Sequence, residues 1–153
     1  MNLIADRNIA NRAVFDLRHI VGVARSGGQA DTRDSLAALA SGVAEEFRRN
    51  VVFIDSLSRT YGFRWECVLQ PGLYTKAHIT DEETSADRRA LDPQLRTLFL
   101  DAYARIRAEH LPHLHDFTPV FDNHPATVYI DVCHVSEEGN AIIADSLAAL
   151  MAH

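Results

Sequence analysis

The stretch Tyr129–Met151 decides the fold class of this 153-residue chain and reads YIDVCHVSEEGNAIIADSLAALM. It begins inside a β-branched and aromatic run, Thr127 to Val132, of the kind that is typical of a strand. Ser136 then precedes an Ile- and Ala-rich segment with helical spacing, where a serine caps the first helical turn. The stretch therefore predicts a strand, a short loop and a final helix.

Upstream, helical and strand patterns also alternate. Helical spacing appears near the N-terminus, and the capping box that Thr80 forms with Glu83 predicts a short helix. The other expected elements are a long helix over residues 32–61, a strand over residues 63–70 and a helix from Pro93 to Leu111. This order predicts an α/β fold with parallel strands and flanking helices. We expect an N-terminal helix and loop of uncertain role over residues 1–31, and the main domain over residues 32–153.

Composition excludes several classes of protein. The chain has 47% hydrophobic and 24% charged residues and a net charge of -6, without a basic block to follow a phosphate backbone. No apolar stretch reaches the length of a membrane span, and the first residues lack the apolar run of a signal peptide. We therefore expect a soluble chain of unknown compartment that does not bind nucleic acid.

An Asp-x-x-His spacing places Asp131 at the predicted strand end and His134 just before the final helix. In open α/β sheets the carboxyl ends of the strands form the ligand crevice. A carboxylate that bonds an imidazole fixes its tautomer, so that the His becomes a competent general base. The alternative from the residues alone is that Asp131 caps the turn and His134 packs at an interface.

The residues around this pair resemble the last conserved block of SGNH/GDSL-type serine hydrolases. The similarity lies in the strand, the Asp-x-x-His, the polar cap, the Gly139-Asn140 pair and the Ile/Ala-rich helix. The segments CVLQPGLYTKAHITDEE (67–83) and FTPVFDNHPATVYID (117–131) also resemble parts of that superfamily. The resemblance covers roughly the second half of the chain.

This resemblance implies part of a three-layer αβα, flavodoxin-like fold in which Asp131 orients His134 and His134 activates a serine. It implies hydrolysis of a small-molecule, lipid or carbohydrate acyl or acetyl ester, with no metal or organic cofactor. The family's Gly-Asp-Ser and Gly-x-Asn blocks are not found, and no serine of this chain lies in a Gly-Asp-Ser context. We therefore expect the chain to be nearly inactive alone and to need a segment that carries the nucleophilic serine. Without the family's first strands, the predicted strand at residues 63–70 would have an unpaired edge. We therefore also expect the isolated chain to self-associate.

Other readings remain open. One is a non-catalytic α/β binding or interaction module derived from the same fold. Another is a metal-dependent hydrolase that uses the histidines around residues 110–124, although Pro112 breaks the helical geometry there. Gln70 and Lys76 follow the first predicted strand at the same sheet end as the His134 loop and could contact substrate. The alternative, which we favour, is a loop turn with a solvated lysine. Cys67 and Cys133 are predicted to be buried free thiols, and a strand would point Cys133 away from His134.

Overall fold

A computed structural model describes residues 29–152, so the helix predicted near the N-terminus lies outside the described residues. The elements in chain order are α2 (Gln29–Tyr61), β1 (Cys67–Leu69), η1 (Leu73–Thr75), α3 (Asp81–Ala86), η2 (Arg88–Leu91), α4 (Pro93–Ala108), β2 (Leu114–Asp116), η3 (Thr118–Phe121) and α5 (Glu137–Met151). The described part is mostly helical with one small parallel sheet, which is consistent with the α/β class. None of its helices combines the length and hydropathy that crossing a bilayer requires.

The helix starts follow from local capping. Thr80 accepts a hydrogen bond from the backbone of Glu83, whose side chain bonds back to the Thr80 N–H, as the capping box predicts. Asp92 accepts from two backbone N–H groups at the start of α4, ahead of Pro93. Ser136 accepts from Gly139 N–H and begins α5. The predictions of the long helix, α3, α4 and α5 are confirmed.

The strands differ from the prediction. β1 covers only Cys67–Leu69 of the strand expected over residues 63–70, and β2 lies in the His-rich segment where no strand was expected. The two pair in parallel, with Cys67 opposite Leu114 and Leu69 opposite Asp116. The strand predicted over residues 127–132 is wrong, because this segment makes only a single antiparallel bridge between Tyr129 and Val135.

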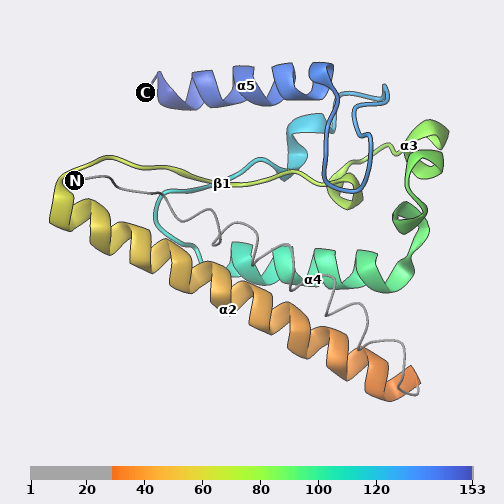
Figure 1. The fold of residues 1–153 in the computed structure, drawn as a ribbon, viewed down its shortest axis with the longest axis horizontal. Helices are drawn as coiled ribbons and strands as arrows, with labels where there is room; N and C mark the ends of the chain where they lie inside the picture. The colour runs from red at the N-terminus through yellow and green to blue at the C-terminus, as the bar shows by residue number, and fades with distance from the viewer. Residues whose placement is uncertain (1–28, 153) are drawn as a thin grey trace, which may run out of the picture.

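Helices lie on both sides of the strand pair. Figure 1 shows α5 on one side of β1 and the helices α2 and α4 together on the other. α2 and α4 pack through a buried cluster that includes Leu36, Ala40, Leu98 and Ala102. The largest buried cluster joins the loops between the elements, and its members are Leu73, Tyr74, Ala90, Phe121, Val128, Tyr129 and Val132. The core therefore holds the loop before α5 in place.

The first turn of α5 has no room for a side chain at Gly139. A Cβ there would lie 2.8 Å from the Val135 Cβ and 3.1 Å from the Val128 carbonyl oxygen. Gly139→Ala is therefore expected to lower the free energy of unfolding by about 1–3 kcal/mol, although alanine is the better helix former. Gly42→Ala in α2, where a Cβ meets open space, should instead raise it by about 0.5–1 kcal/mol. Urea denaturation measures the free energy of unfolding of both variants. Changes of the same sign and size in the two would contradict the close packing around Gly139.

Candidate functional site

The predicted site residues lie in the loop that leads into α5, and not at the end of a strand. The loop closes on itself, since Ile130 N–H donates to the His134 carbonyl at 2.9 Å and Ser136 N–H donates to the Val128 carbonyl at 2.8 Å. These bonds bring residues 131 to 134 to the tip of a tight loop. The structure brings Asp131 and His134 together as their spacing predicts, but in a loop and not at the end of a strand.

Asp131 organises the tip of this loop. Its Oδ1 accepts hydrogen bonds from Cys133 N–H at 2.8 Å and His134 N–H at 2.7 Å, and its Oδ2 lies 2.7 Å from His134 Nδ1. Burial raises the pKa of Asp131, but hydrogen bonds from Cys133 and His134 outweigh it and hold that pKa well below its usual range. Asp131 is therefore a carboxylate at neutral pH. It both caps the turn and orients the imidazole.

His134 presents its other ring nitrogen to the surroundings. Its side chain is 71% exposed, and within residues 29–152 no hydrogen-bond partner holds Nε2. A carboxylate on Nδ1 keeps the neutral ring in the tautomer with a proton on Nδ1, which leaves Nε2 free to accept one. The geometry therefore suits a general base.

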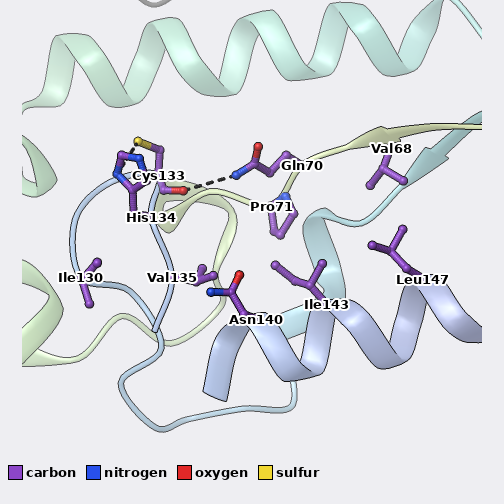
Figure 2. Close-up of a pocket in the computed structure, with 10 residues that line it drawn as sticks. All are labelled: Val68, Gln70, Pro71, Ile130, Cys133, His134, Val135, Asn140, Ile143 and Leu147. Atoms are coloured by element: carbon purple, nitrogen blue, oxygen red, sulfur yellow. Dashed lines mark hydrogen bonds between the residues drawn. The ribbon is translucent and has the colours of Figure 1, made fainter. Parts of the chain in front are cut away.

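An open pocket of about 510 Å³ lies beside His134, between the end of β1 and α5. Figure 2 shows His134 and Cys133 at one end of it, the apolar side chains of Val68, Ile143 and Leu147 toward the other, and the amides of Gln70 and Asn140 between them. Its lining residues are Val68, Gln70, Pro71, Ile130, Cys133, His134, Val135, Asn140, Ile143 and Leu147. The Gln70 amide donates to the Cys133 carbonyl at 3.4 Å and so links β1 to the loop.

Cys133 is not the buried thiol that the sequence indicated. Its side chain is exposed, whereas Cys67 is only partly buried. Because the backbone turns here, the Cys133 sulfur lies 3.5 Å from His134 Nδ1, on the same side as the ring. Partial desolvation and the negative charge of Asp131 raise the pKa of the Cys133 thiol. Cys133 is therefore a thiol rather than an activated nucleophile.

Sequence reasoning missed Arg89, which comes from η2. Its Nη2 lies 3.7 Å from Asp131 Oδ2, while Asp87 holds the same guanidinium at 2.7 Å. The hydrogen bond from Arg89 lowers the pKa of Asp87 despite partial burial. No pattern in the sequence links Arg89 to Asp131, which lies far along the chain. The only local signal is Asp87, which caps the turn by accepting from Arg89 N–H.

A buried ion pair between Lys76 and Glu83 holds the start of the loop that leads into α5. Lys76 Nζ lies 2.8 and 2.9 Å from the two carboxylate oxygens of Glu83, and both side chains are fully buried. Glu83 Oε1 also accepts from Val128 N–H at 2.9 Å and Tyr129 N–H at 3.0 Å. The prediction of a solvated Lys76 is wrong, because the lysine bonds Glu83 and the Ala126 carbonyl inside the protein.

Five of the described serines use their hydroxyls in helix hydrogen bonds. Ser41, Ser56 and Ser58 donate to carbonyls of α2, and Ser146 donates to the Ile142 carbonyl of α5. Ser136 is only two residues from His134, but its hydroxyl caps α5. Ser26, which precedes Gly27-Gly28 in the sequence without a strand before it and is thus a poor candidate for the nucleophile, lies outside the described residues.

The histidines around residues 110–124 do not gather into one site. His115, in β2, lies 2.7 Å from Glu66, and the hydrogen bond from His115 lowers the pKa of Glu66. His113 Nδ1 lies 3.7 Å from the same carboxylate, and its backbone has a positive φ of 59°. Among the residues that the structure describes, these side chains do not form a group of three close ligands.

Comparison with known proteins matches the chain to no family model, no curated protein and no solved structure.

Proposed function

We propose that this chain supplies the Asp131–His134 half of a serine ester-hydrolase site, with the nucleophilic serine outside residues 29–152. In this site Asp131 holds the imidazole through Nδ1, and Nε2 takes the proton of the attacking hydroxyl. The same ring then donates that proton to the leaving alcohol. The substrate is an acyl ester of a small molecule, a lipid or a carbohydrate.

The observation that carries this proposal is the 2.7 Å contact between Asp131 Oδ2 and His134 Nδ1 with Nε2 open beside a pocket. A histidine that serves only to pack is expected to bury its ring or satisfy both nitrogens. His134 does neither, since its side chain is 71% exposed.

The resemblance of residues 129–151 to SGNH/GDSL hydrolases and the helices on both sides of β1 support a larger flavodoxin-like αβα domain as the setting. In that domain a further segment covers the free edge of β1 and carries the serine. β1 pairs only with β2 within residues 29–152, and a strand edge with unpaired backbone groups accepts another strand. That segment belongs to the same polypeptide or to a partner.

Asp131→Asn separates this role from a purely structural one. The amide keeps one oxygen for the N–H groups of Cys133 and His134, but its NH₂ is a donor and cannot accept a hydrogen bond from His134 Nδ1–H. In the chelator-treated complete enzyme, with its serine-bearing segment present, this variant should lower the rate of 4-nitrophenyl acetate hydrolysis by about 100-fold. The melting temperatures of wild type and variant are measured as well, so that a loss of activity can be told apart from a loss of stability. A variant with an unchanged rate and lowered stability would show that Asp131 only caps the turn, as in a non-catalytic binding module.

A further inference from the structure

Three different ligand types meet at the tip of the loop before α5. One carboxylate oxygen of Asp131, the Cys133 sulfur and His134 Nδ1 all lie within 4.8 Å of one another. Figure 2 shows the sulfur of Cys133 beside the His134 ring. Within residues 29–152 this is the one group of three or more such residues that is close enough to share an ion.

The spacing matches two corners of a tetrahedral zinc site. With a Zn–S bond of about 2.3 Å and a Zn–N bond of about 2.05 Å, tetrahedral angles place sulfur and nitrogen about 3.5 Å apart. The observed distance from Cys133 Sγ to His134 Nδ1 is 3.5 Å. Asp131 Oδ2 lies 2.7 Å from the same nitrogen, so an ion that binds both needs them to separate by about 0.6 Å. The exposed His134 ring has room for this movement.

The environment selects a soft cation. A thiolate and an imidazole bind zinc well, whereas magnesium and calcium prefer sets of oxygen ligands. Arg89, with its Nη2 at 3.7 Å from Asp131 Oδ2, opposes an extra positive charge, but Asp87 offsets much of that opposition. Cys133 and His134 are both exposed, so an ion can reach them from solvent.

We propose that Asp131, Cys133 and His134 form a site for zinc or a similar thiophilic divalent cation, and that this ion switches off the His134 base. The ion takes Nδ1, the nitrogen that now bonds Asp131. The Cys133 thiol proton passes to buffer, and the imidazole proton moves from Nδ1 to Nε2. Nε2 then carries a proton and can no longer accept one from a nucleophile. This regulatory effect rests on the proposed function, whereas binding of the ion does not.

Cobalt(II) tests the site directly, because a thiolate ligand gives a near-ultraviolet charge-transfer band. The full chain has two cysteines, so Cys133→Ser is compared with the matched control Cys67→Ser. We expect a band that saturates at one ion per chain in wild type and in Cys67→Ser, that zinc displaces, and that is lost in Cys133→Ser. His134→Ala should weaken cobalt binding by more than roughly 10-fold. A missing band in wild type, a band that survives in Cys133→Ser, or unchanged affinity in His134→Ala overturns the proposal.

The inhibitory effect is measured separately from binding. Zinc should stop the ester hydrolysis of the chelator-treated complete enzyme, and Cys133→Ser in that enzyme should need roughly 10-fold more zinc for the same fractional loss. If zinc binds and hydrolysis continues unchanged, the regulatory role is wrong. If the complete enzyme, with its serine-bearing segment, hydrolyses no ester without metal, the proposed function fails, and the cobalt spectrum still decides whether the site exists.

Discussion

Replacing Glu83 with alanine is expected to lower the free energy of unfolding by about 3–5 kcal/mol. The change leaves the Lys76 ammonium buried with only the Ala126 carbonyl as a partner. It also removes the acceptor of the Val128 and Tyr129 N–H groups. An uncompensated buried charge and three backbone N–H donors without their acceptor, the third being Thr80 N–H, together make this the largest stability effect that the structure predicts. Chemical denaturation measures it.

The matched control is Glu82→Ala, because Glu82 is the exposed neighbour of Glu83 and its hydrogen bonds go to Thr80, to Thr127 at 3.4 Å and to its own backbone, not to a buried charge. That variant should stay within about 0.5 kcal/mol of wild type. Similar losses in both variants would contradict the buried pair.

The Lys76–Glu83 pair also makes the free energy of unfolding depend on pH. Burial raises the pKa of Glu83, but bonds from Lys76 and three backbone N–H groups outweigh it, so the pKa is lowered on folding. The pair therefore stabilises the protein above the unfolded pKa of about 4.3, and this contribution is lost as the pH falls through the folded value. The stability gap between wild type and Glu83→Gln should accordingly shrink below about pH 4.

Replacing His134 with alanine is expected to have the largest effect on activity. If Nε2 is the base, its removal takes away proton transfer to and from the reacting oxygens, and the rate of the complete enzyme should fall by about 1,000-fold or more. The side chain is 71% exposed, so stability should change by no more than about 0.5 kcal/mol. The rate of ester hydrolysis and the melting temperature are measured on the same preparation.

The matched control is His78→Ala, which removes an exposed loop histidine outside the pocket lining. Its rate should equal that of wild type. A large loss of stability in His134→Ala with an unchanged rate would instead favour a structural histidine.

The helices could be predicted from sequence because their signals are local. The Thr80 box, Pro93 in the first turn of α4 and the Ser136 cap are each signals within three residues, and the structure contains all of them. The pairing of Asp131 with His134 is also local, since a turn of three residues brings the two together. These parts follow from spacing alone.

The parts that failed depend on contacts between distant residues. Residues 127–132 have the composition of a strand, but the Val128 and Tyr129 N–H groups bond the Glu83 carboxylate and not a neighbouring strand. Lys76 has the sequence context of a surface lysine, and only its partner seven residues on explains its burial. Likewise, the thiol of Cys133 faces His134 because the loop turns, which an extended chain would not allow.

The most direct test of the central claim is to label the product of the complete reading frame, with the proteins that co-purify with it, using a fluorophosphonate. This reagent bonds a serine that a base activates. The account predicts one labelled serine outside residues 29–152, and predicts that His134→Ala abolishes the labelling while His78→Ala does not. Labelling that persists in His134→Ala, labelling at Ser136, or no labelling of any serine would contradict the claim that His134 is the base of a serine hydrolase.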